Sequence, residues 1–429
     1  MKIQITILFI FLSLGIYAQQ FLANMPEPVS NNAVTGAYVN GVPHVFSFSG
    51  IDTTKIWTGI HKKAFRYNVE TDEWTTIAEL PSGTGRIAAG ASTVKNKIYI
   101  IGGYEVFANS NERTLDEVHI YDPNTNEYET NGQPIPVPID DHVQLVYRDS
   151  LIYCVTGWSQ NTNVQNVQIY NPSRDEWLEG TPVPNSSTFK VFGGSGAIVG
   201  DTIYYLGGAR IGSAFPSSNQ FRKGYINPND PTEITWSTAT NPLAVLYRAA
   251  SFAKNDKVIW FGGSAVTYNF DGIAYNGSGG VSPIERILEY DPLNGDLISD
   301  GENSFPDFMD YRGIASFPDD NTFYFCGGME SGQSVSNKTF VLVNPTSSTR
   351  EKETDFGVNI FPNPSSDFVK IEIEGQANLH ISNIEGRLFL KDKIENSSSI
   401  NLKSYQPGIY IFSLFKDGKL VHSERVVRE

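Results

Sequence analysis

The chain has 429 residues, a formal net charge of -15 at pH 7 and only two cysteines. A strongly acidic protein is a poor candidate for sequence-independent binding of nucleic acid, because that binding needs a basic surface that displaces counterions from phosphates. The 38 glycines, 23 prolines, 26 phenylalanines and 21 tyrosines, against 4 methionines, favour short strands and tight turns over long helices. We therefore expect an all-β chain that is long enough for more than one domain.

The first 18 residues have the pattern of an export signal. Lys2 is followed by an apolar run over Ile3–Leu14 and then by small and apolar residues that end at Ala18. This run is shorter than the about 20 apolar residues that a membrane span needs, so we expect a signal peptide over residues 1–18 that is cleaved after Ala18. An uncleaved anchor is the alternative. No later stretch approaches spanning length, so the mature chain is expected to have no transmembrane segment.

A unit of about 50 to 55 residues repeats through most of the chain. Each unit ends an apolar run at a glycine pair or at a substituted form of that pair. The six pairs are Ser49-Gly50, Gly102-Gly103, Thr156-Gly157, Gly207-Gly208, Gly262-Gly263 and Gly327-Gly328. Downstream comes a tyrosine that is followed seven residues later by another aromatic residue, as in Tyr67 and Trp74. These signals weaken in the later units but keep their order.

The glycine pair, the tyrosine and the tryptophan in this order resemble kelch repeats. The resemblance covers residues 19–345 and implies a β-propeller of six blades, each a four-stranded antiparallel sheet. A single blade cannot cover both of its apolar faces, whereas blades arranged in a ring cover each other.

The sixth unit supplies only three strands, and the missing strand has a candidate at the other end of the chain. The segment Phe21–Pro26 is similar to Thr76–Pro81, the last strand of the first unit. We expect it to complete the sixth blade and close the ring, which leaves no open sheet edge. Cys154 and Cys326 then lie three blades apart, too far for a disulfide, so two buried free thiols are expected.

The last part of the chain is a separate module. Residues 346–355 are polar and predict a linker. Residues 356–429 hold short strands separated by turn signals and predict a small β-sandwich.

This module resembles the C-terminal sorting domain of the type IX secretion system. The matching residues are Pro362, Asn363 and Pro364, then Gly386, and then Gly408 and Tyr410. The resemblance implies passage through the periplasm, recognition by the type IX machinery at the outer membrane, and removal of the domain with release or attachment to the cell surface. A carbohydrate-binding or fibronectin-like sandwich is the alternative.

Two features of the propeller are candidate ligand sites. Long loops collect on one face, where aromatic residues such as Trp57 and Tyr275 suit sugar or peptide ligands. The alternative is that these rings only pack the loops onto the barrel. On the same face, the mouth of the central channel is expected to carry Asn32, Arg86, Asp141, His142, Lys190, Arg248 and Arg312, with Tyr247-Arg248 and Tyr311-Arg312 as a repeated pair. Such a cationic ring would attract an anionic group, although arginines here also suit contacts between blades.

Catalysis is the less favoured hypothesis. Kelch-type propellers include a sialic acid mutarotase and a copper oxidase acting on galactose. The six histidines are scattered and no nucleophile, zinc or phosphate motif is present, so we expect no metal and no cofactor and assign no catalytic residue. The sequence favours a secreted or surface-attached module that binds a glycan or a protein on its long-loop face. The alternative is a mutarotase of the sialic acid type, in which the arginines of the channel mouth, Asp141 and His142 would serve as anchor, acid or base.

Overall fold

The computed structural model describes residues 18–301, 303–318, 321–343, 358–383, 388–416 and 419–428. The chain divides into two compact units, Met1–Pro345 and Thr346–Glu429. Strands and three short 3-10 helices make up the described elements. None of the helices in these ranges has the length and apolar character needed to cross a membrane. Nearly all of the predicted signal peptide, and the whole predicted linker over residues 346–355, fall outside the described residues.

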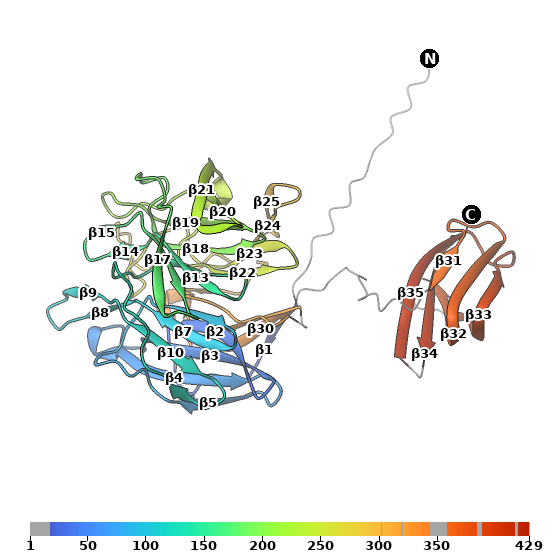
Figure 1. Ribbon diagram of the computed structural model, residues 1–429, viewed down its shortest axis with the longest axis horizontal. Coiled ribbons are helices and arrows are strands. Elements are labelled where there is room, and N and C mark those ends of the chain that lie inside the picture. The colour runs from blue at the N-terminus through green and yellow to red at the C-terminus, as the bar shows by residue number, and fades with distance from the viewer. Residues whose placement is uncertain are drawn as a thin grey trace, which may run out of the picture. The chain divides into compact units, whose positions relative to one another are not determined.

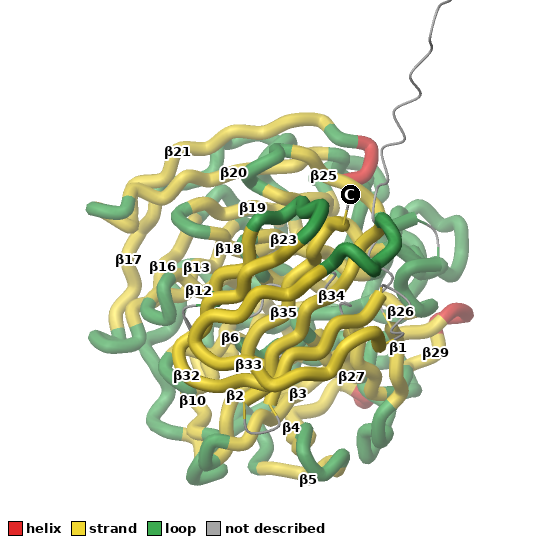
Figure 2. Tube along the Cα trace, turned by 90° about the vertical axis from the view of Figure 1, so that its right-hand side faces the viewer, coloured by secondary structure: helices red, strands yellow, loops and turns green. Residues whose placement is uncertain are grey.

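The first unit is a ring of antiparallel sheets that follow one another along the chain (Figures 1 and 2). Five of these blades have four strands each. Their strands are, in order, β2 (Ala33–Val39), β3 (Val42–Ile51), β4 (Ile60–Asn68) and β5 (Glu73–Ile77); β6 (Gly90–Val94), β7 (Lys97–Ile101), β10 (Val118–Asp122) and β11 (Glu127–Tyr128); β12 (Val143–Tyr147), β13 (Leu151–Val155), β16 (Val167–Asn171) and β17 (Glu176–Gly180); β18 (Phe192–Val199), β19 (Thr202–Ala209), β20 (Gln220–Asn227) and β21 (Asp230–Thr240); β22 (Ala250–Lys254), β23 (Lys257–Phe261), β24 (Ile287–Asp291) and β25 (Asp296–Ser299). The first strand of each blade faces the centre of the ring.

The sixth blade combines both ends of the unit. Its sheet has the order β1 (Ala18–Phe21), β30 (Thr339–Val343) and β27 (Thr322–Cys326), and its innermost segment pairs through the single bridge Ala315 to Tyr324. The chain start is therefore the outer strand of this blade, in the register Phe21 opposite Phe340. The paired strand overlaps the predicted segment Phe21–Pro26 at Phe21, and the backbone of that segment continues to bond to the sixth blade, with Leu22 N donating to Thr339 O at 2.9 Å and Met25 N donating to Asn337 O at 2.7 Å. The side chain of Met25 is buried in the core between the sixth and first blades.

The repeated aromatic residues join neighbouring blades. Tyr67 Oη donates to Asp72 at 2.7 Å and fixes the turn that follows β4, while the ring of Tyr67 lies 5.4 Å from that of Trp74. The indole of Trp74 donates to the carbonyl of Ala23 at 3.0 Å, and the indole of Trp177 donates to Gln133 of the preceding blade at 2.8 Å. These contacts explain the seven-residue spacing: both rings fill the space between blades, and the indole N–H finds a partner on the neighbouring blade.

The glycine pairs lie where the second strand of a blade passes the backbone of the next blade. Gly102 has φ +65°, and a Cβ there would lie 2.1 Å from the carbonyl oxygen of Ile139. Gly207 has the same conformation and would meet Leu246 at 2.0 Å. Ser49 and Thr156 replace the first glycine in the first and third blades and keep a left-handed φ of 54° and 48°. Close backbone approach therefore explains the repeat signal.

The links from second to third strands, and those between blades, share one face of the ring, which we call the long-loop face. They carry the small elements η1 (Trp57–Gly59), β8 (Tyr104–Val106), β9 (Glu112–Thr114), β14 (Trp158–Ser159), β15 (Thr162–Asn163), η2 (Pro242–Ala244), β26 (Phe308–Met309), β28 (Met329–Glu330), η3 (Ser331–Gln333) and β29 (Ser334–Val335). The links from first to second strands lie on the opposite, short-loop face.

The second unit is a small β-sandwich, as the sequence predicts. Its strands are β31 (Asn359–Phe361), β32 (Phe368–Asn383), β33 (Leu388–Asn401), β34 (Gly408–Lys416) and β35 (Lys419–Arg428). The long strand β32 pairs with β31 before Gly375 and with β34 after it, while β33 pairs with both of its halves. Apolar side chains from all five strands form the core of this unit.

Candidate functional site

A ring of hydrogen bonds joins all six blades at the long-loop end of the central channel. One residue of each blade, at or shortly before the beginning of the innermost segment, has a left-handed φ between 47° and 69°. These residues are Asn31, Ala88, Asp141, Gly193, Arg248 and Asp310. Their backbone groups bond from blade to blade, as in Gly193 N to Asp141 O and Arg248 N to Gly193 O, both at 2.8 Å. Side chains complete the circle: Asn31 Oδ1 accepts from Ala88 N at 2.8 Å, and Ser30 Oγ donates to Asp310 at 2.6 Å.

Two arginines and two aspartates form a buried charge cluster inside this ring. Arg248 donates to Asp141 at 2.7 Å and lies 3.4 Å from Asp310. Arg312 lies 3.0 Å from Asp141 and 3.5 Å from Asp310. Burial alone would raise the pKa of Asp141, but the two guanidiniums outweigh it and hold this pKa below its ordinary value. The predicted cationic ring is therefore wrong, because the positive charges are matched by carboxylates within the same cluster.

Arg86 and Lys190, which were expected at the mouth, do not line the channel. Arg86 is fully buried at the start of the second blade, where it forms an ion pair with Glu117 and donates to the carbonyl of Gly102 at 3.0 Å. Lys190 is partly exposed. Arg86 thus makes the structural contact that the sequence left open as the alternative.

The two Tyr-Arg pairs do not occupy equivalent positions. Tyr247 bridges to Ser264, whereas the corresponding bridge of the sixth blade joins Met309 to Met329. Tyr311-Arg312 therefore lies two residues further along the chain than Tyr247-Arg248. As a result, Arg248 belongs to the hydrogen-bonded ring, while Arg312 reaches the same aspartates from within the channel.

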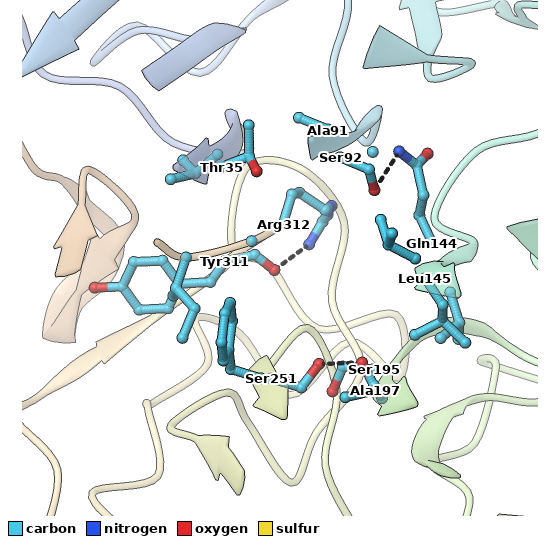
Figure 3. Close-up of a pocket in the computed structure, with 18 of the residues that line it drawn as sticks. Thr35, Ala91, Ser92, Gln144, Leu145, Ser195, Ala197, Ser251, Tyr311 and Arg312 are labelled. Atoms are coloured by element: carbon cyan, nitrogen blue, oxygen red, sulfur yellow. Dashed lines mark hydrogen bonds between the residues drawn. The ribbon is translucent and has the colours of Figure 1, made fainter. Parts of the chain in front are cut away.

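The channel holds a cavity of about 370 Å³, lined by the first strands of the blades. Polar side chains from several blades face it, including Thr35, Ser92, Gln144, Ser195, Ser251 and Arg312 (Figure 3). Asp141 and Arg248 close the cavity at the long-loop end and are buried, whereas Val146, Ile198 and Ala253 at the other end are partly exposed. The cavity therefore opens toward the short-loop face, and its closed end is where the sequence predicted an open mouth.

His142 lines the same cavity as a neutral imidazole. Burial lowers its pKa to about 4. Gln144 donates its amide N–H to Ser92 at 2.9 Å, so its carbonyl oxygen accepts from His142 Nε2 at 2.8 Å. The proton is thereby fixed on Nε2, and Nδ1 has no hydrogen-bond partner among the described residues. The ring can accept a proton or a hydrogen bond at Nδ1.

Most of the loop aromatics pack against one another over the closed end. The ring of Tyr275 lies 5.0 Å from that of Phe215 and 6.2 Å from that of Phe192. Tyr247 and Tyr268 are fully buried, and the guanidinium of Arg248 lies 4.9 and 5.2 Å from their rings. Tyr275 and Tyr247, both expected to contact ligand, are thus parts of the loop packing.

Trp57 and Phe107 differ from these packed rings, because 46% and 42% of their surfaces are exposed. They line a hollow of about 760 Å³ between the long loops of the first and second blades, together with Thr58, Ile60, Thr84, Gly85, Glu105, Val106, Ala108 and Asn109. We call it the Trp57–Phe107 groove. Glu105 is buried at its wall and pairs with Arg113 at 2.5 Å. The groove is mostly apolar, with polar groups at a few points.

In the second unit, the predicted sorting residues secure the terminal strand. Asn363 Nδ2 donates to the carbonyl of Arg425 at 2.5 Å, and Asn363 Oδ1 accepts from Val427 N at 2.9 Å. Pro362 and Pro364 flank this asparagine. Gly408 begins β34 opposite Arg428, and the buried Tyr410 donates to Gln406 O at 2.9 Å. Gly386 lies outside the described residues. Within the described ranges, no three His, Cys, Asp or Glu side chains gather to hold a metal ion.

Comparisons with known proteins match the first part of the propeller and the second unit. Residues 18–208 match the model of the KLHDC2/KLHL20/DRC7 Kelch-repeats domain, and residues 359–429 match the Secretion system C-terminal sorting domain. Kelch-like protein 23 of Homo sapiens is 26% identical over 234 residues, which cover 54% of this chain and 36% of the relative. Kelch-like protein terF of Aspergillus terreus is 27% identical over 207 residues, which cover 46% of this chain and 42% of the relative.

The chain thus spans well under half the length of these curated relatives. The solved structure titled "Structure of YjhT" has a TM-score of 0.60 at 16% identity and covers 76% of this chain and 98% of its own, a likeness of fold alone. The sorting domain implies export through type IX secretion to the cell surface or the extracellular space. The chain is a kelch-repeat β-propeller followed by a type IX C-terminal sorting domain.

Proposed function

We propose that this protein is an exported binding module that holds a glycan in the Trp57–Phe107 groove of its long-loop face. The observation that carries the proposal is the exposure of Trp57 and Phe107, which line a hollow of about 760 Å³ while other loop aromatics are packed away. Large apolar side chains left exposed around a hollow are typical of binding sites.

The lining of the groove fits a sugar. The flat face of an indole or phenyl ring packs against the apolar C–H face of a pyranose. Thr58, Thr84 and Asn109 also line the groove and offer hydroxyl and amide groups for hydrogen bonds to sugar hydroxyls. A peptide is the other ligand that suits such a groove, and a screen with both classes distinguishes them.

The test is a glycan and peptide array probed with the mature chain, followed by calorimetric titration of the best ligand. Trp57→Ala and Phe107→Ala should each weaken binding by about tenfold, the loss expected when one aromatic contact of a small ligand is removed. Tyr225→Ala is the matched control, because Tyr225 is 51% exposed on β20 and lies outside the groove. Glycan binding that is unchanged in both groove variants would contradict the proposal.

Export is proposed to begin with cleavage after Ala18. In support, the paired strand of the sixth blade spans Ala18–Phe21, so the chain after this cut would keep most of β1. N-terminal sequencing of the exported protein tests the cut, and fractionation of the culture into cells and medium tells surface attachment from release.

A sugar mutarotase is the second candidate function. It is favoured by the neutral imidazole of His142, whose Nδ1 has no partner among the described residues and which lines the channel cavity with Asp141 and Arg312. A base that takes the anomeric hydroxyl proton is one requirement of anomer exchange. Proton NMR of sugar anomers tests this function: exchange faster than in buffer that is lost in His142→Gln supports it, and exchange at the buffer rate contradicts it.

A further inference from the structure

The closed end of the channel cavity contains buried polar atoms without a hydrogen-bond partner among the described residues. They are Arg312 Nε and Nη2, Arg248 Nε, Asp141 Oδ1 and His142 Nδ1. All four residues line the cavity, and the side chains of Arg312, Arg248 and Asp141 are only 8%, 1% and 2% exposed. Arg312 Nη2 and Asp141 Oδ1 lie within ion-pair distance but are not aligned as a hydrogen bond. Three of these atoms, Arg312 Nε, Arg248 Nε and His142 Nδ1, therefore have neither a hydrogen-bond partner nor an ion-pair partner among the described residues. Because buried polar groups are normally hydrogen-bonded, three such atoms at one point indicate a site built for a ligand.

The chemistry of these atoms matches hydroxyl groups. The guanidinium nitrogens donate hydrogen bonds, whereas Asp141 Oδ1 and His142 Nδ1 accept them. A hydroxyl both donates and accepts, so adjacent hydroxyls on one molecule can pair with both kinds of atom. The hydroxyls of Thr35, Ser92, Ser195 and Ser251 lie further along the same cavity.

The charges in the cavity exclude a preference for anions. Arg248 and Arg312 are matched by Asp141 and Asp310, and His142 is neutral because burial lowers its pKa. A carboxylate or phosphate would therefore lose its water without meeting net positive charge, and it would lie beside Asp141.

We propose that the channel cavity binds a small neutral polyhydroxyl compound, a monosaccharide or a cyclitol, which enters from the short-loop face. The volume of about 370 Å³ is at the small end of the range for ligand sites. The partly exposed Val146, Ile198 and Ala253 mark the entrance, and the charge cluster closes the far end. This site is separate from the Trp57–Phe107 groove and does not depend on glycan binding there. It is the cavity of the second candidate function, but it requires only binding of the compound and no exchange of anomers.

The test is calorimetric titration of the mature chain with myo-inositol and D-galactose as neutral probes and N-acetylneuraminate as the anionic comparison. The neutral probes should bind and the anion should bind more weakly. Arg312→Met removes the guanidinium, including the two nitrogens that have no hydrogen-bond partner among the described residues, and should weaken binding by about tenfold or more. Ala253→Phe narrows the entrance without touching the charge cluster and should also abolish binding. Trp57→Ala lies in the groove and should leave cavity binding unchanged.

The outcome that overturns the proposal is a folded protein that binds neither neutral probe, or that binds N-acetylneuraminate more tightly than both. Neutral binding that persists in a folded Ala253→Phe variant would overturn the proposed entrance and cavity alike. If Arg312→Met does not fold, the result with Ala253→Phe alone tests the proposal. This variant is expected to fold, because its side chain lies at the rim of the cavity. Loss of neutral binding in Trp57→Ala would place the probe in the groove and refute the separate site.

Discussion

Replacing Arg248 by methionine should destabilise the propeller by about 4 kcal/mol. The guanidinium of Arg248 is buried and pairs with Asp141 at 2.7 Å and Asp310 at 3.4 Å. Removal of one partner from a buried ion pair costs about 3 to 5 kcal/mol, because the remaining charge is left buried without compensation. Two aromatic contacts of the guanidinium, with Tyr247 and Tyr268, add about 1 kcal/mol. Arg312 stays near both carboxylates and offsets part of the loss.

The destabilisation should depend on pH. In the natural protein, the lowered pKa of Asp141 contributes stability above its unfolded pKa of about 4, and this contribution is lost as the pH falls below that value. In Arg248→Met, only Arg312 remains to counter the effect of burial, so the pKa of Asp141 should rise. The buried carboxylate is then ionised without full compensation at neutral pH, and its destabilising effect is largest there. The difference in unfolding free energy between Arg248→Met and the natural protein should therefore shrink from pH 7 to pH 5.

Urea unfolding at pH 7 and pH 5 measures both effects. The double variant Arg248→Met with Asp141→Asn should recover about 2 kcal/mol of the loss, since it removes one of the two uncompensated charges. A loss below about 1 kcal/mol, the value of an exposed pair, would refute the buried cluster. A difference that stays the same between pH 7 and pH 5 would refute the carboxylate as its cause.

Three further predictions concern the rest of the propeller. Arg86→Met leaves the partly exposed Glu117 without its arginine and should lower the unfolding free energy by about 1 to 2 kcal/mol, measured by urea titration; no change would contradict a stabilising role of the buried Arg86 guanidinium. Cys154 and Cys326 are buried and free, and burial raises the pKa of Cys326 to about 12, so neither should react with a thiol reagent until the chain is denatured. A mass that shows a bridge between them would contradict the ring. Deletion of Gln19–Pro28 removes most of β1 and should lower the melting temperature, and an unchanged value would mean that β1 does not hold the sixth blade.

The sequence predicts the ring well because its signals are local. A glycine pair such as Gly102-Gly103 marks a close backbone approach in each unit, and the tyrosine and tryptophan that follow reach the next blade from fixed positions. The strand at the chain start was predicted in the right blade, but the regular strand spans Ala18–Phe21 and so begins three residues before the predicted segment Phe21–Pro26.

The charge cluster was only partly predictable. Arg248, Arg312, Asp141 and His142 do meet in the channel, whereas Arg86 lies elsewhere. The residues of the channel mouth were aligned between blades by their distance along the chain from the glycine pair. This alignment assumes that the distance is the same in every blade, and it differs in the sixth blade.

Asp310 was missed for the same reason. It takes the left-handed position of the ring, and the enrichment of Asn and Asp in that backbone conformation is too weak a signal to mark one position in a sequence. The long-loop end also looked open from the sequence, because the packing of Tyr275 and Tyr268 over it depends on loop conformation.

The most direct test of the proposed function is calorimetric titration of the mature protein with the best glycan from the array, in parallel with Trp57→Ala and Tyr225→Ala. We expect saturable binding whose affinity falls about tenfold in Trp57→Ala and is unchanged in Tyr225→Ala. Binding that is equally strong in all three proteins, or that is lost only in Tyr225→Ala, would contradict the groove as the glycan site.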